Sequence, residues 1–181
     1  DGLYDRTITV NGLSKAFAMT GWRIGYLAAP EWIAKACNKV QGQVTSGTNA
    51  IAQRASIVAL RAPKSKIQYM IDEFLKRRNL VLQLLGEIEG LKLNVPEGAF
   101  YVFPDVSSFF GKTLRGRTIN NASDFSLYLL EEAGVATVTG EAFGDPKCIR
   151  LSYAASEEEL RKAIARIRKF ARLIKNITFA A

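Results

Sequence analysis

The sequence predicts an α/β arrangement at the start of the chain and an α+β layer in the remainder. Thr7–Val10 is a β-branched run followed by an Asn-Gly pair that favours a turn, and Ile24–Ala28 is a second short apolar run that stops before Pro30. Between residues 67 and 88, apolar side chains recur at helical spacing. The segments after this stretch predict the order strand, strand, helix, strand, strand, helix, which is an α+β order.

The N-terminal elements are expected to end at a break in the sequence. The two strands are followed by helices expected over residues 31–40 and 48–60. The Ala62-Pro63 pair interrupts this pattern, because the residue before a proline is disfavoured in the α conformation. We therefore expect one domain over residues 1–62 and a second over residues 63–181, entered through a long bridging helix.

Glycine and serine residues set the expected limits of the later elements. These elements are a helix over 67–88 that ends at Gly90, strands over 91–95 and 99–103, a helix from Ser123 to Gly134, strands over 135–138 and 148–153, and a final helix from Ser156. Glycine is favoured just after a helix and serine just before one. Three glutamates follow Ser156, so the last helix opens with a capping box whose charges complement the helix dipole.

Composition excludes several classes of function. The 181 residues are 48% hydrophobic, which suffices for a packed core, and no apolar run reaches the length of a membrane span. The N-terminus lacks the pattern of a signal peptide, so a cytoplasmic protein is expected. With no histidine and with only Cys37 and Cys148, we expect no metal site, no disulfide framework and no Ser-His-Asp catalysis. Lysine remains as the natural base.

The net charge of +8 raises the question of nucleic-acid binding. Much of the positive charge lies on one face of the expected C-terminal helix, opposite an apolar face, and Lys175 belongs to this basic face. No aromatic residues that could stack with bases are interleaved with these cations. The pattern therefore favours a solvated helix face, and no nucleic-acid partner is expected.

Lys15 and Arg23 are two cations set among apolar and small residues in the connection between the first two expected strands. A buried guanidinium cannot lose its proton, so Arg23, between Trp22 and Ile24, is expected to face a fixed anion such as a phosphate. An amine among apolar neighbours and near a cation is less readily charged, which makes Lys15 a nucleophile towards carbonyl groups.

The stretch from Ser14 to Tyr26 resembles the cofactor-lysine signature of class I pyridoxal-phosphate aminotransferases, with the sequence Ser-Lys-Ala-Phe-Ala-Met-Thr-Gly-Trp-Arg-Ile-Gly-Tyr. The resemblance implies the C-terminal part of a fold-type I enzyme, in which residues 1–62 end the large cofactor-binding domain and residues 63–181 form the small domain. It further implies that Lys15 binds pyridoxal 5′-phosphate covalently and that Arg23 binds its phosphate. Some members have a phosphate-binding hydroxyl three residues before the lysine, where this chain has Gly12.

A second anion site is expected near the C-terminal end. Residues 148–154 alternate, so that Arg150 faces away from the apolar row that contains Ile149 and Tyr153. Arg150 resembles the family arginine that holds the substrate α-carboxylate through two parallel hydrogen bonds. The Gly-Ala-Phe-Tyr run at residues 98–101 resembles a wall of the substrate pocket, and Phe100 is the residue that we place nearest the substrate.

The resemblance implies transfer of an amino group between an amino acid, with aspartate as the expected substrate, and a 2-oxo acid. Family members are typically homodimers. They carry a cofactor-binding half before the signature, and the first residue here is Asp1, so we expect this chain alone to be an inactive fragment. Two alternatives remain open: a pyridoxal-phosphate-dependent lyase or decarboxylase of the same fold, and the aminotransferase-like effector domain of a transcription regulator.

Overall fold

The computed structural model describes residues 2–175 of the chain, the side chain of Lys175 excepted. Contacts divide the chain into two compact units, Asp1–Tyr69 and Met70–Ala181, called here the N-terminal unit and the C-terminal unit. The expected domain boundary at residues 62 and 63 lies a few residues before this division and stays a prediction.

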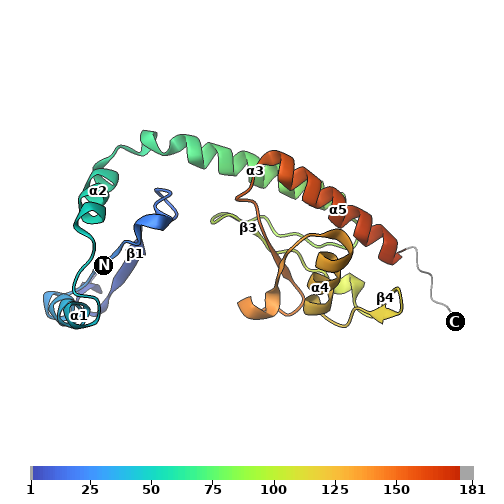
Figure 1. Cartoon of the computed structure of the whole chain (residues 1–181), viewed down its shortest axis with the longest axis horizontal. Helices are drawn as coiled ribbons and strands as arrows, with labels where there is room; N and C mark the ends of the chain where they lie inside the picture. The colour runs from blue at the N-terminus through green and yellow to red at the C-terminus, as the bar shows by residue number, and fades with distance from the viewer. Residues whose placement is uncertain (1, 176–181) are drawn as a thin grey trace. The chain divides into compact units, whose positions relative to one another are not determined.

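Two strands and two helices form the N-terminal unit (Figure 1). Strand β1 (Thr9–Gly12) pairs antiparallel with β2 (Gly25–Ala28), in the register that sets Thr9 opposite Ala28 and Gly12 opposite Gly25. Helices α1 (Glu31–Val44) and α2 (Ala50–Arg61) follow. Both predicted strands and both predicted helices are confirmed, but the Asn-Gly pair belongs to β1 itself, and the turn begins after it.

Few apolar side chains are buried in the N-terminal unit. Every residue of β1 and β2 is exposed, so neither face of the strand pair is covered. Helix α1 has no buried residue, and its Trp32 is 71% exposed. Leu13 and Met19 are the large exceptions, at 1% and 7% exposure, and the small side chains of Ala29 and Ala52 are also buried. The elements of this unit supply too little surface to cover the apolar residues that their sequence carries.

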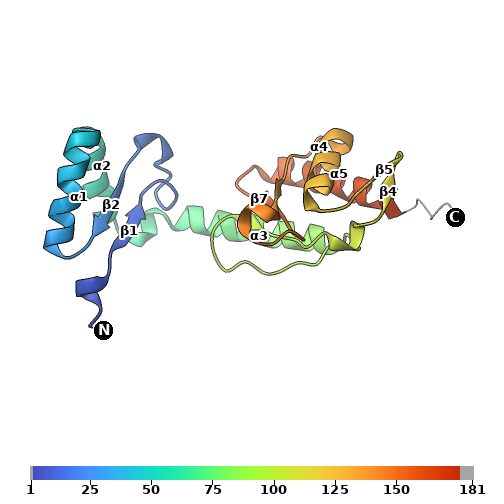
Figure 2. The same ribbon diagram turned by 90° about the horizontal axis from the view of Figure 1, so that it is seen from below.

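The C-terminal unit is built on a three-stranded antiparallel sheet in the order β3-β7-β6. These strands are short: β3 spans Tyr101–Val102, β6 spans Val138–Thr139 and β7 spans Ile149–Ser152. A separate hairpin, β4 (Thr113–Leu114) and β5 (Arg117–Thr118), lies near the C-terminal end of α5 (Figures 1 and 2).

Three helices complete the C-terminal unit: α3 (Gln68–Gly86), α4 (Ala122–Ala133) and α5 (Glu157–Lys175). The Arg168 guanidinium on α5 contacts Glu87 and the Leu84 carbonyl, which ties α5 to the end of α3. The predicted apolar face of α5 is buried, with 1% to 7% exposure at Leu160, Ile164, Ile167, Phe170, Ala171 and Ile174. Phe125 of α4 packs between Phe109 and Phe170, with ring centroids 5.2 and 5.4 Å away.

Several expected element limits are wrong in the C-terminal unit. The strand over 91–95 is reduced to one bridge between Lys92 and Asp105, and the strand over 135–138 shortens to β6. The cap of α4 is Asn121, whose side chain accepts a hydrogen bond from the Asp124 N–H at 2.8 Å, and Ser123 lies inside the helix. Asparagine is as good a cap as serine, so local pattern alone did not separate the two positions.

Two expected helix ends of this unit are confirmed. Gly134 ends α4 in the left-handed conformation, and the Ser156 hydroxyl accepts a hydrogen bond from the Glu159 N–H at 3.3 Å at the start of α5. Among the described residues, no helix is both long enough and apolar enough to cross a membrane.

Candidate active site

Lys15 lies in a tight turn that follows β1. The turn is closed by hydrogen bonds from the Phe17 N–H to the Leu13 carbonyl and from the Ala18 N–H to the Lys15 carbonyl, both 3.2 Å long. Because Leu13 is buried at 1% exposure, it anchors the turn, and Lys15 two residues later is exposed. The prediction that Lys15 follows a strand on a connecting loop is therefore confirmed.

Arg23 lies at the other end of the same connection, just before β2. It has a φ of 52°, a left-handed conformation that is uncommon for a residue with a side chain, and it follows the 3₁₀ turn Thr20–Trp22. Its guanidinium donates a hydrogen bond from Nη1 to the Thr20 carbonyl at 3.0 Å. Among the described residues, no carboxylate forms an ion pair with Arg23.

The expectation that Arg23 is buried in the chain is wrong. Arg23 and its neighbour Trp22 are both exposed, and Ile24 is half-buried. Apolar neighbours in sequence indicate a core only when another element covers them, and the N-terminal unit supplies no such cover. The pairing of Gly12 with Gly25 nevertheless brings the two ends of the connection together, so Lys15 and Arg23 belong to one short loop closed by β1 and β2.

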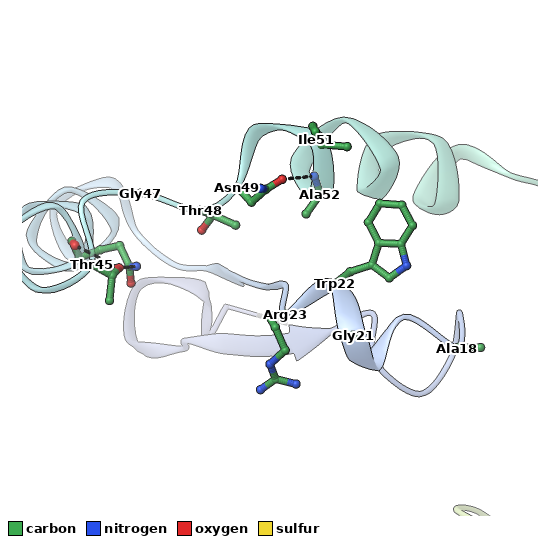
Figure 3. Close-up of a pocket in the computed structure, with 11 residues that line it drawn as sticks. Ala18, Gly21, Trp22, Arg23, Thr45, Gly47, Thr48, Asn49, Ile51 and Ala52 are labelled. Carbon is green, nitrogen blue, oxygen red and sulfur yellow. Dashed lines mark hydrogen bonds between the residues drawn. The ribbon is translucent and has the colours of Figure 1, made fainter.

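A pocket of about 820 Å³ is lined by this connection, the end of α1 and the start of α2 (Figure 3). Its walls carry both polar and apolar groups, and Asn49 caps α2 by accepting a hydrogen bond from the Ala52 N–H at 2.9 Å. In Figure 3 the Trp22 ring extends toward α2, whereas the Arg23 guanidinium extends in the opposite direction. The guanidinium is therefore directed away from the start of α2.

Arg150 lies in the central strand of the C-terminal sheet and opposite Val138 of β6. The predicted alternation is confirmed, because Ile149 and Tyr153 are buried while Ser152 is exposed. Two aromatic rings flank the guanidinium, since its central carbon lies 4.3 Å from the ring centroid of Tyr101 and 4.1 Å from that of Phe143.

Phe100 faces the interior of the C-terminal unit. It is half-buried, packs against the hydrophobic core and stacks on Phe74 of α3 with 5.9 Å between ring centroids. Its carbonyl accepts a hydrogen bond from the Tyr153 N–H at 2.9 Å. The side chain of Tyr101, next along the chain, contacts Arg150.

Tyr101 and Phe143 are the two residues near Arg150 that sequence reasoning missed. The period-2 alternation of a strand was the available signal for Tyr101, because Tyr101 pairs with Ser152, which shares the face of Arg150. Phe143 lies in the glycine-bounded run Gly140–Gly144 just before β7, but no sequence pattern indicated that its ring contacts Arg150, because this depends on how the loop folds.

The pKa values of two titratable side chains, one on either side of β7, are raised by their surroundings. Burial and, to a smaller extent, the neighbouring Asp145 raise the pKa of the Cys148 thiol to about 11. Burial also raises the pKa of the Tyr153 hydroxyl, which donates a hydrogen bond to the Ala99 carbonyl at 3.0 Å. Both groups are thus neutral near pH 7 and add no charge at the two ends of the strand that carries Arg150.

Two curated relatives of this chain are aspartate aminotransferases. A bifunctional aspartate aminotransferase and glutamate/aspartate-prephenate aminotransferase of Petunia hybrida is 50% identical over 172 residues, which are 93% of this chain and 36% of the relative. An aspartate aminotransferase of Rhizobium meliloti is 49% identical over 167 residues, or 92% of this chain and 41% of the relative. The chain therefore spans about two fifths of the length of the curated relatives that it matches.

Solved structures agree with these relatives. A crystal structure of the aspartate aminotransferase from Rhizobium meliloti matches with a TM-score of 0.92 at 47% identity, over 96% of this chain and 44% of that one. An aromatic aminotransferase from Pyrococcus horikoshii matches with a TM-score of 0.86 at 38% identity, over 97% of this chain and 45% of that one. The fold is therefore that of part of a fold-type I aminotransferase. A family profile for aminotransferases of class I and II matches residues 2–167, and the chain accordingly belongs to this family.

Proposed function

We propose that this chain supplies Lys15, Arg23 and Arg150 to an enzyme that transfers an amino group between an amino acid and a 2-oxo acid with the help of pyridoxal 5′-phosphate. The observation that carries the proposal is the loop between β1 and β2, which exposes an amine and a guanidinium on one connection closed by strand pairing. Aspartate is the proposed amino donor, in line with the names of the relatives from Petunia hybrida and Rhizobium meliloti.

The chemistry of these side chains fits the cofactor. A primary amine can bond to an aldehyde carbon, and a guanidinium binds phosphate oxygens through two parallel hydrogen bonds. One nitrogen of Arg23 already donates to the Thr20 carbonyl, which orients the group without neutralising its charge. Arg23 has no ion pair among the residues described, so its charge is left for an anion.

Each residue has a distinct role in the proposed reaction. Pyridoxal 5′-phosphate, when bound, supplies an aldehyde and a ring that accepts electrons from the substrate α-carbon. Lys15 would hold the cofactor through Nζ, and its amine would serve as the base that takes up and returns the proton at the substrate α-carbon. Arg23 would hold the phosphate of the cofactor, and Arg150 would hold the α-carboxylate of the substrate, each through charge-assisted hydrogen bonds.

We further propose residues 1–62 as the end of a large cofactor-binding domain and residues 63–181 as the small domain, in a cytoplasmic protein that forms a homodimer. Phe100 is proposed as the residue of the Gly-Ala-Phe-Tyr run nearest the substrate, with its ring stacked on Phe74. The exposed apolar surface of the N-terminal unit supports an incomplete large domain. This chain alone is therefore expected to catalyse no measurable transamination.

Ion pairs on α5 support the proposal that its basic face is exposed to solvent and does not bind nucleic acid. Arg161 pairs with Glu157 at 2.8 Å, Lys162 pairs with Glu158 at 2.6 Å, and Arg168 pairs with Glu87 at 2.5 Å. Cations that already have carboxylate partners release fewer counterions on a phosphate backbone.

Reductive trapping tests the proposal on the chain as it stands. Incubation with pyridoxal 5′-phosphate and cyanoborohydride, followed by peptide mass spectrometry, is expected to label Lys15 at lower cofactor concentration than the exposed Lys35 of α1. Arg23→Gln is expected to raise the concentration for half-labelling of Lys15 about tenfold, because a charge-assisted phosphate contact is lost. The matched variant Arg61→Gln, at an exposed arginine of α2, should leave the labelling unchanged.

Two results would contradict the proposal. Labelling of Lys15 that is no more selective than that of Lys35 would remove the cofactor assignment. Robust formation of a 2-oxo acid from aspartate by the 181-residue chain would contradict the expected incompleteness of the site.

A further inference from the structure

The guanidinium of Arg150 has two aromatic neighbours that come from different elements. Tyr101 lies on β3, whose pairing with β7 sets Tyr101 opposite Ser152, and Phe143 ends the 3₁₀ helix Gly140–Phe143. The distances from the guanidinium carbon to the two ring centroids, 4.3 and 4.1 Å, are well within the 6 Å or so at which cation–π attraction is significant.

Each ring is itself held in place. The Tyr101 ring packs against the Phe100 ring, with centroids 4.5 Å apart. The Phe143 ring packs edge-on against Phe103, with centroids 6.3 Å apart and an angle of 87° between planes. The loop that carries Phe143 is closed by a hydrogen bond from the Gly140 N–H to the Cys148 carbonyl at 2.7 Å. The rings are therefore a fixed frame around a long side chain that would otherwise sample many rotamers.

No carboxylate of the described chain neutralises this guanidinium. The ion pairs of the C-terminal unit involve other cations, and Arg150 contacts the two rings instead. Contacts of a guanidinium with aromatic rings do not use up its N–H groups as hydrogen-bond donors, so these groups can still donate to a partner. A planar carboxylate can accept two parallel hydrogen bonds from them.

We propose that Tyr101 and Phe143 are positioning residues that hold the Arg150 guanidinium in the orientation that accepts a substrate carboxylate. This inference rests on the carboxylate-binding role of Arg150 given above. The two rings act by ordering Arg150 before the substrate arrives, so that the cost of immobilising its side chain is met during folding. Loss of either ring is expected to weaken carboxylate binding about 3- to 10-fold.

Nuclear magnetic resonance of the 181-residue chain labelled with ¹³C,¹⁵N-arginine tests the inference. The δ-methylene and ε-NH protons of Arg150 are expected upfield of their ordinary positions, because they lie over two aromatic rings. Maleate, a simple dicarboxylate, serves as the probe and is expected to move the Arg150 ε-NH signal in a saturable way. Arg150→Lys identifies the signal, since it removes the resonance.

Paired variants separate a positioning role from a structural one. Tyr101→Leu and Phe143→Leu are expected to move the Arg150 signals toward ordinary positions and to raise the maleate dissociation constant about 3- to 10-fold each. Tyr101→Phe and Phe143→Tyr keep a ring and are expected to restore both readouts. Unchanged amide signals of the buried Ile149 and Ile164 show that the C-terminal unit is folded in each variant.

Three outcomes would overturn the inference, and they are distinguishable. Ordinary Arg150 shifts in the wild-type chain would show that the rings do not flank the guanidinium. If the leucine variants lose the upfield shift but bind maleate as tightly as wild type, the rings have no positioning role, and the proposed function stands. If the shift is present but maleate leaves Arg150 unaffected, the carboxylate-binding role of Arg150 fails, and the inference fails with it.

Discussion

Substitution of Gly140 by alanine should destabilise the C-terminal unit through backbone overlap alone. Gly140 begins the loop that carries Phe143, and its φ lies outside the left-handed region, so alanine is not disfavoured there by conformation. A Cβ added at Gly140 would, however, overlap the carbonyl oxygens of Asp145 and Cys148. Both obstacles are main-chain atoms, which cannot move aside as the end of a flexible side chain can.

The expected loss in the free energy of unfolding follows from the hydrogen bonds that the added Cβ would weaken. Gly140 donates to the Cys148 carbonyl at 2.7 Å, and its own carbonyl accepts from the Asp145 N–H at 3.1 Å. Weakening these two bonds costs about 1 kcal/mol each, and overpacking of a close-packed site costs about 1–3 kcal/mol. Because the two effects overlap, Gly140→Ala is expected to lower the free energy of unfolding of this unit by about 2–4 kcal/mol.

Urea unfolding followed by the methyl signals of Ile149 and Ile164 measures this change within the core of the C-terminal unit. Gly98→Ala is the matched control, since a Cβ there meets no atom within 4 Å, and it should change the free energy of unfolding by less than about 0.5 kcal/mol. The reasoning is refuted if Gly140→Ala also changes the free energy of unfolding by less than about 0.5 kcal/mol. Displacement of the loop should also reduce the upfield shift of the Arg150 signals.

Three further changes test other parts of the C-terminal unit. Burial raises the pKa of Asp105, but the hydrogen bonds from Ser107 and the charges of Lys92 and Lys147 together outweigh it. The net pKa is therefore lowered from 3.8, and the carboxylate stabilises the fold above about that pH. Asp105→Asn should therefore lower the free energy of unfolding at pH 7, with a difference from wild type that shrinks below about pH 4; a difference independent of pH would contradict this. The Cys148 thiol, with its pKa raised to about 11, should react with a disulfide reagent at pH 8 only after unfolding, whereas the half-buried Cys37 reacts in the native chain; equal rates would be the contrary result. Asn121→Ala should lower the free energy of unfolding, measured by heat or urea, by about 1 kcal/mol, and Asn121→Ser should lower it much less. Equal decreases for the two variants would mean that the cap hydrogen bond is not responsible.

Local patterns predicted those features that depend on one segment. The buried face of α5 and the alternation along β7 were both predictable, because the period of side chains in a helix or strand is set by the backbone itself. The positions of Lys15 and Arg23 on a loop between two strands were predictable because the apolar runs on either side mark the two strands. The choice of Asn121 over Ser123 as a cap was not, because both residues satisfy the same local rule.

The amino-acid sequence by itself determined which chemical groups this protein carries and on which kind of element each one lies: an amine and a guanidinium on one loop, and a second guanidinium on a strand. Only the tertiary structure decided which of these groups are covered and by what. Arg23 is exposed because no other element of its unit packs over it, and Arg150 is flanked by Tyr101 and Phe143 because β3 and a folded loop bring them to it. Burial and ring contacts arise between segments distant in sequence, so no local pattern contains them.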